Sequence, residues 1–433
     1  MDKWQELYKK KLKNAQEIVS QIPPGAICAT TCALGEAVGL AQALAERAEK
    51  EGLTGITHHL LLTLRNLKYL ESGMEDRVKH VAWFTSGFAR KAVQEGRADF
   101  MPCYYKDVPR IWKEFVEADI FYATVSPMDK HGWFSFGVSA STGKAQMSRA
   151  KKIFLEVNKN MPRTHGSQFV HISEADAIFE NHVPLAELGE GSINEQDAVI
   201  GNYIAELIPN GATIQLGIGG VPNAVARALK VKRDLGIHSE MFTEGMVELI
   251  EAGVVNNSKK NIHRYKSITS FAAGSKRMYD YLDDNPGVEF HSIDYVNDPN
   301  IIGLHDNFVS INATLEVDLI GQACSESIGS KQFSGTGGQV DFVRGAGLSK
   351  GGKSFITTYS TAKNDTISKI KPVLTQGAHV TCTKNDIDYV VTEYGVARLK
   401  GKTASQRAKE LISIAHPKFR EELTLSAKKM NLL

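Results

Sequence analysis

The sequence predicts an α/β protein made of two tandem open α/β domains of similar topology, with mainly parallel sheets. Three observations lead to this prediction. Residues 212–229, ATIQLGIGGVPNAVARAL, have the pattern of a buried strand, a glycine turn and an amphipathic helix in succession. The pentapeptide IPNGA at 208–212 repeats IPPGA at 22–26, and a similar strand, turn and helix follow each copy. The length of 433 residues also exceeds what one hydrophobic core usually serves.

The first domain is expected over residues 1–188. Its opening helix, 2–21, carries apolar residues near helical spacing and stops at the two prolines of IPPGA. An alanine- and leucine-rich helix is expected to end near residue 50, after the first strand and turn. Apolar and β-branched runs between turn signals predict strands at 27–31, 55–62, 118–125 and 152–157.

The second domain is expected over residues 189–433, with the linker at 183–191 (VPLAELGEG). Ser192 and Glu195 have the spacing of a capping box, which would open the first helix of this domain. The unit 212–229 follows, and after it 236–245 is expected to be a short strand that ends in an acidic turn. Further strands are expected at 267–272, 308–315, 354–359, 379–383 and 389–395.

The richest glycine loop of the chain lies within residues 327–346 and contains Gly335, Gly337 and Gly338. Apolar residues such as Phe333 and Val340 are interleaved with its polar residues, which is unlike a flexible linker. We therefore expect the backbone of this loop to approach a ligand closely.

The composition is that of an ordinary globular enzyme. With 51 basic and 49 acidic residues the net charge is +2, which gives no reason to expect a nucleic acid or a membrane as partner. The first residues are charged and lack an apolar signal core, so a cytoplasmic location is expected. Five scattered cysteines argue against a disulfide framework, and we expect no metal site.

The turns after 212–216 and within 236–245 should lie side by side, because parallel strands joined by one helix are usually neighbours. One interpretation is a dinucleotide site, in which Gly217 and Gly219 follow the strand and Glu240 binds a ribose. Pro222 stands where that pattern wants Gly or Ala. A second interpretation makes Glu240 a nucleophile, and a third makes it only a cap of the next turn.

The nucleophile interpretation requires little from the surrounding residues. A glutamate with an ordinary pKa of about 4.3 is ionised at neutral pH and needs no general base. An acyl group facing it would need positioning and an oxyanion hole, and Gly219, Gly220 and Val221 would offer backbone amides for this purpose.

Four motifs in the same order along the chain resemble those of the family I coenzyme A transferases of the acetyl-CoA hydrolase/transferase group. Within this group the chain is most similar to enzymes that act on 4-hydroxybutyrate and on butyryl-CoA with acetate. The resemblance covers essentially the whole length. Its motifs are SPMDKHG at 126–132, QLGIGGVPN at 215–223, HSEM with TEGMVEL at 238–249, and SKQFSGTGGQVDF at 330–342.

The resemblance implies that Glu240 forms a glutamyl-CoA thioester. The first domain is expected to be catalytically inactive. In the repeat we expect His59 at the position that corresponds to Glu240, and the turn that corresponds to Gly217–Gly220 lacks the glycines. Coenzyme A would be a substrate, with no permanently bound cofactor and no metal. The residues implied at the coenzyme or the oxyanion are Gly217, Ile218, Gly219, Gly220, Val221, Gly335, Gly337, Gly338 and Lys363.

The implied function is transfer of coenzyme A from a short-chain acyl-CoA to acetate, butyrate or 4-hydroxybutyrate by a ping-pong mechanism. An acyl-CoA hydrolase with the same glutamate remains an alternative, as do succinate or itaconate as the acid. A nicotinamide or sugar-phosphate enzyme on an α/β fold is a third alternative. A homo-oligomer, dimer or tetramer, is expected.

Overall fold

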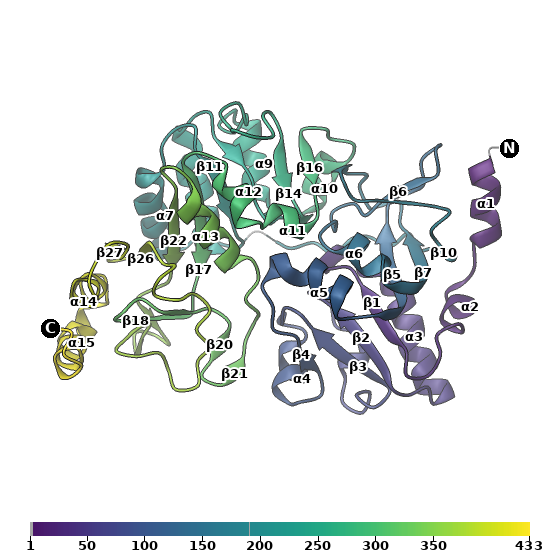
Figure 1. Ribbon diagram of the computed structural model, residues 1–433, viewed down its shortest axis with the longest axis horizontal. Coiled ribbons are helices and arrows are strands. Elements are labelled where there is room, and N and C mark those ends of the chain that lie inside the picture. Colours follow the sequence, from purple (N-terminus) through teal and green to yellow (C-terminus); the bar gives the residue numbers. More distant parts are fainter. Residues whose placement is uncertain (1–2, 190) are drawn as a thin grey trace. The chain divides into compact units, whose positions relative to one another are not determined.

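The computed structural model describes residues 3–189 and 191–433 (Figure 1). The chain folds into two compact units that do not follow the sequence order throughout. The first unit comprises the residues up to Leu188 together with Ile268–Val296, and the second comprises Gly189–Ser267 and Asn297–Leu433. A division into domains at residue 188 stays a proposal, to which the structure adds that 268–296 packs with the first unit.

The first unit contains a seven-stranded sheet in the order β10-β7-β5-β1-β2-β3-β4, and every pair in it is parallel. Helices cover both faces. Residues of α2 (Ala15–Val19) and α3 (Val38–Glu51) form one hydrophobic core with the sheet. On the other face, Trp112 of α5 (Val108–Glu114) packs against His59. The strands are β1 (Ile27–Thr30), β2 (Ile56–Leu60), β3 (Val78–Ala82), β4 (Asp99–Phe100), β5 (Ala118–Val125), β7 (Ala150–Val157) and β10 (Ala177–Glu180).

Two of the predicted helices differ from those in the structure, one in its continuity and one in its cap. The opening helix is not continuous: α1 (Lys3–Lys11) ends and α2 begins after Asn14, whose side chain forms a capping box with Glu17. In the second unit, α7 (Glu195–Leu207) is capped by Asn194 rather than by Ser192. In both cases an Asn side chain satisfies the free N–H groups of the first helical turn.

The segment that returns to the first unit is joined to it by strands. In a three-stranded sheet of order β14-β16-β8, β16 (Val288–Phe290) pairs in parallel with β8 (His165–Gly166). The remaining elements of the first unit are β6 (Trp133–Ser135), β9 (Phe169–His171), β14 (Ser267–Thr269), β15 (Phe271–Ala272), α4 (Arg90–Gln94), α6 (Gly143–Met147), α10 (Lys276–Leu282) and α11 (Ile293–Val296).

The second unit is built on a six-stranded sheet in the order β12-β11-β17-β22-β26-β27. Its pairs are parallel except for the last, β26 with β27. The sheet strands are β11 (Thr213–Leu216), β12 (Gly236–Ile237), β17 (Phe308–Ala313), β22 (Lys353–Thr357), β26 (Tyr389–Thr392) and β27 (Gly395–Arg398). The helices are α7, α8 (Gly220–Ala228), α9 (Glu244–Glu251), α12 (Pro299–Gly303), α13 (Gln339–Leu348), α14 (Ala404–Ser413) and α15 (Pro417–Lys429).

The second unit also contains short strands outside this sheet, within residues 316–371. Among them, β18 (Glu316–Asp318) pairs with β19 (Ala323–Cys324) and with β25 (Ile370–Lys371). Two short hairpins complete this group, with strands β20 (Ser327–Ile328), β21 (Lys331–Gln332), β23 (Thr361–Ala362) and β24 (Ile367–Ser368).

The predicted α/β fold with mainly parallel sheets is confirmed. The strand order β26-β22-β17-β11-β12 of the second unit matches β10-β7-β5-β1-β2 of the first, so the two units share a topology. The repeat pentapeptides occupy equivalent places: Thr57 N–H donates to Ala26 O at 3.0 Å, and Gly236 N–H donates to Ala212 O at 2.9 Å. In the part of the chain that the structure describes, no helix has the length and apolar composition needed to cross a membrane.

This register changes the residue that answers Glu240 in the first unit. Because Gly236 is equivalent to Thr57, counting four residues onward places Leu61 at the position of Glu240. The expected His59 is instead equivalent to His238. The two copies differ in length between their strands, and sequence comparison alone misplaced the gap.

We expect Gly166→Ala to destabilise the protein by about 3 kcal/mol, because two costs add there. Gly166 has a φ of +122°, and an added Cβ would lie 2.0 Å from the carbonyl oxygen of Phe290. Gly96→Ala is the matched control, with a φ of +74° and open space around the Cβ, and should cost only about 1 kcal/mol. Urea unfolding measures both, and equal losses would show that the approach of β16 to β8 is not tight.

Candidate active site at the ends of two parallel strands

Glu240 lies where the two parallel strands β11 and β12 end. His238 N–H donates to Ile214 O at 3.2 Å, and Ser239 Oγ donates to Leu216 O at 3.3 Å. These bonds hold the residues just before Glu240 against the last residues of β11. The glycine turn starts directly after Leu216, so this turn and Glu240 share one edge of the sheet.

The glycine turn needs glycine at two positions for two different reasons. Gly219 has a φ of +117° and precedes the first residue of α8, so its backbone conformation excludes other residues. Gly220 is restricted by packing, because an added Cβ would lie 2.2 Å from Oδ2 of Asp197. Ile218 between them is 59% exposed. The turn is therefore rigid where it meets the protein and open at its tip.

Asp197 is itself fixed beneath the turn. Its Oδ1 accepts a hydrogen bond of 2.7 Å from the Tyr359 hydroxyl, and its Oδ2 accepts one of 3.0 Å from Asn194 N–H. The side chain is almost fully buried. A buried carboxylate with both oxygens satisfied is a stable support, and it accounts for the close approach of Gly220 without reference to a ligand.

Two N–H groups donate to the carboxylate of Glu240. Asn297 Nδ2 donates to Glu240 Oε2 at 2.8 Å, and the backbone N–H of Gly338 forms a second hydrogen bond with the same carboxylate. An added Cβ on Gly338 would lie 1.9 Å from Glu240 Oε2, so only glycine permits this approach. Gly338 also precedes the first residue of α13.

Burial raises the pKa of Glu240 to about 7, although the hydrogen bonds from Asn297 and Gly338 act in the opposite direction. The expectation of an ordinary glutamate pKa is therefore wrong for this residue. Removal from water disfavours the charged form, and two donors compensate for only part of that cost. A carboxyl group that titrates near neutral pH at a sheet edge is typical of a functional site.

The structure places the other predicted residues as follows. Gly338 reaches Glu240, and Gly337 before it adopts a left-handed conformation with a φ of +56°. Gly335 is buried in the same loop. Lys363 lies on the exposed turn between β23 and β24, and among residues 3–189 and 191–433 no hydrogen bond or ion pair joins it to Glu240 or to either glycine segment.

Sequence reasoning missed Asn297 and Asp341. Asn297 is fully buried, and its Nδ2 lies 3.4 Å from Oδ2 of Asp341 on α13, in addition to its bond with Glu240. Asp341 belongs to the motif at 330–342, so the sequence could have indicated it as a candidate site residue. Asn297 belongs to a short Asn-Asp-Pro stretch that reads only as a turn signal.

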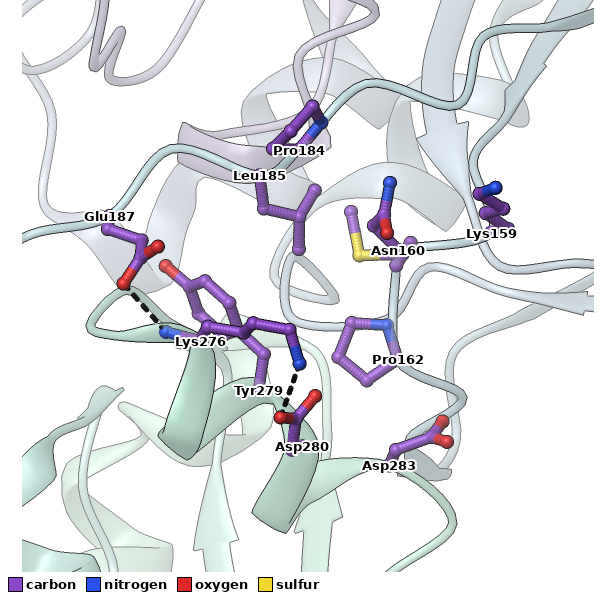
Figure 2. A pocket seen from close by; sticks show the side chains of 11 residues that line it. Lys159, Asn160, Pro162, Pro184, Leu185, Glu187, Lys276, Tyr279, Asp280 and Asp283 are labelled. Carbon is purple, nitrogen blue, oxygen red and sulfur yellow. Dashed lines mark hydrogen bonds and ion pairs between the residues drawn. The ribbon is translucent and has the colours of Figure 1, made fainter.

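A cavity of about 310 Å³ in the first unit is a different feature (Figure 2). It is lined in part by Pro184 and Leu185, and two of its charged residues, Lys276 and Glu187, have partners in the protein. Lys276 Nζ contacts Asp280 Oδ2 at 2.5 Å, and the Lys276 N–H donates to Glu187 Oε2 at 2.9 Å (Figure 2). The cavity therefore marks where the segment before residue 189 is fastened to α10, and its lining offers no arrangement for catalysis.

Within residues 3–189 and 191–433, no cluster of three or more His, Cys, Asp or Glu side chains is arranged so that it could hold a metal ion.

Two family models and several known proteins match the chain. Residues 1–187 match the acetyl-CoA hydrolase/transferase N-terminal domain, and residues 274–427 match the acetyl-CoA hydrolase/transferase C-terminal domain. The chain is 48% identical to succinyl-CoA:cyclohexane-1-carboxylate CoA transferase of Geobacter metallireducens, over 99% of this chain and 97% of that protein. It is also 48% identical to 4-hydroxybutyrate coenzyme A transferase of Clostridium kluyveri, over 98% and 99% respectively.

A solved structure shows the same fold. RipA from Yersinia pestis superimposes with a TM-score of 0.95 at 41% sequence identity, and the match covers 100% of both chains. The chain thus belongs to the acetyl-CoA hydrolase/transferase family, and it is an enzyme of the coenzyme A transferase class.

Proposed function

We propose that this enzyme transfers coenzyme A from a short-chain acyl-CoA to a short carboxylic acid through a glutamyl-CoA thioester on Glu240. The observation that carries the proposal is the environment of Glu240, whose carboxylate accepts hydrogen bonds from Asn297 and from Gly338 of the glycine loop. A carboxylate that only capped the next turn would accept hydrogen bonds from N–H groups of that turn. The donors of Glu240 come instead from distant parts of the sequence.

The proposed chemistry balances with the carboxylate as the only nucleophile from the protein. A carboxylate oxygen of Glu240 attacks the thioester carbonyl, and the bond to sulfur breaks to leave an acyl-glutamyl anhydride and coenzyme A thiolate. The thiolate then attacks the glutamyl carbonyl, and the first acid leaves as its carboxylate. The second acid attacks the glutamyl thioester and the same steps run backwards.

The hydrogen bonds to Glu240 support this route at its second step. When thiolate attacks the glutamyl carbonyl, negative charge grows on an oxygen of the carboxyl group that already accepts from Asn297 and Gly338. Donors that are in place before the reaction stabilise such charge without reorganisation. The same donors hold the carboxylate in one orientation for its first attack.

The glycine segments complete the proposal. The start of α8 leaves backbone N–H groups without intrahelical partners, and the cap position Gly219 has no side chain to bind them. We assign Gly217, Ile218, Gly219, Gly220 and Val221 to the coenzyme and to the oxyanion of the incoming acyl group. Gly335, Gly337, Gly338 and Lys363 are assigned to contacts with the coenzyme.

Acetate, butyrate or 4-hydroxybutyrate is proposed as the acid. The similarity to the Clostridium kluyveri enzyme, which is named for 4-hydroxybutyrate, favours that group. Succinate deserves testing as well, because the Geobacter metallireducens enzyme is named for succinyl-CoA. A cytoplasmic homo-oligomer remains part of the proposal, and light scattering would measure its size.

Incubation with acyl-CoA alone should add the mass of coenzyme A, less water, to the one peptide that contains Glu240. Borohydride should reduce this thioester and inactivate the enzyme only when acyl-CoA is present. Glu240→Ala should abolish adduct and turnover, and Glu240→Asp should lose on the order of 10²-fold in kcat because the carboxylate withdraws by about 1 Å. Glu244→Gln is the matched control and should keep the adduct; a label on another residue, with turnover in Glu240→Ala, would refute the assignment.

The rate should depend on the ionisation of Glu240. Because burial raises the pKa of this carboxyl to about 7 and only the carboxylate attacks, kcat/KM should rise with pH through about 7 and level off above about 8. Asn297→Ala removes a bond that lowers the pKa, so its acidic limb should move to higher pH and kcat should fall roughly 10²-fold. A profile that is flat between pH 5.5 and 8 in both proteins would contradict this.

A transferase and a hydrolase give different products in one assay. With butyryl-CoA and acetate we expect acetyl-CoA to form. Without an added acid we expect little free thiol, because water is a poor substitute for a positioned carboxylate as the attacking group. Double-reciprocal plots at several acetate concentrations should be parallel. Release of free coenzyme A at one rate with or without acetate, butyrate, 4-hydroxybutyrate or succinate would establish hydrolysis instead.

A further inference from the structure

A second buried glutamate, Glu326, is fastened to the glycine loop that reaches Glu240. Glu326 is only 8% exposed. Its Oε2 accepts hydrogen bonds from the hydroxyls of Thr336, at 3.0 Å, and Thr381, at 2.9 Å. Thr336 belongs to the loop, whereas Thr381 lies outside it. The carboxylate therefore joins the loop to a separate segment of the second unit.

The backbone of Glu326 holds the beginning of the same loop. Its carbonyl oxygen accepts from the N–H groups of Phe333, at 2.7 Å, and Ser334, at 3.1 Å. The Ser334 hydroxyl donates in turn to the carbonyl oxygen of Ser325 at 3.2 Å. The loop is thus bound at its start by main-chain N–H groups and by the Ser334 hydroxyl, and further along by the side chain of Thr336.

That side-chain bond is close to the reacting group. Only Gly337 separates Thr336 from Gly338, whose N–H donates to Glu240. Glycine is the residue that restricts the backbone least, so the chain between Thr336 and Gly338 has little stiffness of its own. A donor that drifts by about 1 Å loses much of its effect on a carboxylate.

The direction of these hydrogen bonds is fixed by their neighbours. Thr381 Oγ1 accepts a hydrogen bond of 3.0 Å from Ser325 N–H, which leaves its proton for Glu326. A carboxylate oxygen can accept both hydroxyl protons. A buried carboxyl group needs hydrogen-bond partners to offset its loss of water, and the two hydroxyls supply them to Oε2 of Glu326.

We propose that Glu326 and Thr336 are positioning residues, whose hydrogen bond holds the Gly335–Gly338 loop so that the Gly338 N–H stays on the Glu240 carboxylate. The inference rests on the proposed function, since it concerns the donor that Glu240 uses there. Glu326 itself does not react.

Thr336→Val tests the bond, because valine keeps the shape of threonine and removes the hydroxyl. We expect kcat to fall about tenfold, the size of one hydrogen bond, and the acidic limb of kcat/KM to move to higher pH as the Gly338 donor is lost. Thr336→Ser should restore both to within about twofold. Thr375→Val is the matched control: it removes a 2.7 Å bond to Glu316 in the same unit and should leave rate and pH profile unchanged.

The outcomes separate the inference from the proposed function. Wild-type enzyme that forms no adduct at Glu240 refutes the proposed function. If wild-type enzyme forms the adduct and Thr336→Val matches it in rate and pH profile, only the positioning role is refuted. A loss that Thr336→Ser fails to restore also refutes it, since the hydroxyl would then not be the cause. Thr336→Ala repeats the test if the valine variant does not fold.

Discussion

The carboxylate of Glu240 is the constraint on which the active site depends. Burial raises its pKa to about 7, and the hydrogen bonds from Asn297 and Gly338 act against that rise. A charge-assisted hydrogen bond contributes about 1.5–3 kcal/mol, whereas withdrawing a carboxylate from water costs more than one such bond returns. The candidate site therefore holds a carboxylate that has lost part of its hydration and can still ionise near neutral pH.

Three glycines of the turn after β11 and of the loop before α13 are required for three separate reasons. Gly219 is required by its φ angle, Gly220 by the carboxylate of Asp197, and Gly338 by the carboxylate of Glu240. Replacing any of them would have a different consequence, because strain, displacement of a support and displacement of the nucleophile are distinct effects. Glycine thus permits an unusual backbone conformation at Gly219, and at Gly220 and Gly338 it permits the backbone to approach a carboxylate closely.

Much of the fold could be predicted because its signals are local. The strands 27–31, 118–125 and 308–315 are marked by apolar runs between turn signals, and β1, β5 and β17 lie within those ranges. The repeated pentapeptide revealed the shared topology. It could not give the register between the copies, and for that reason His59 was expected where Leu61 stands.

The environment of Glu240 was beyond sequence reasoning for a physical reason. Its raised pKa results from burial, and its donors Asn297 and Gly338 come from segments remote in the chain. No periodicity or spacing records such distant contacts. The choice of Glu240 itself came from its place after a strand and from the family motifs, whereas the role of Glu326 became visible only with the hydrogen bonds of Thr336.

The return of 268–296 to the first unit limits how this family can recombine. A crossover between two genes at residue 188 would exchange what looks like the whole second half. It would also bring β16 from one parent against β8 from the other, at the place where Gly166 leaves no room for a side chain. Neither half is therefore an independent module, although the two units share a topology: changes at β8 must be matched by changes at β16, more than a hundred residues later in the chain.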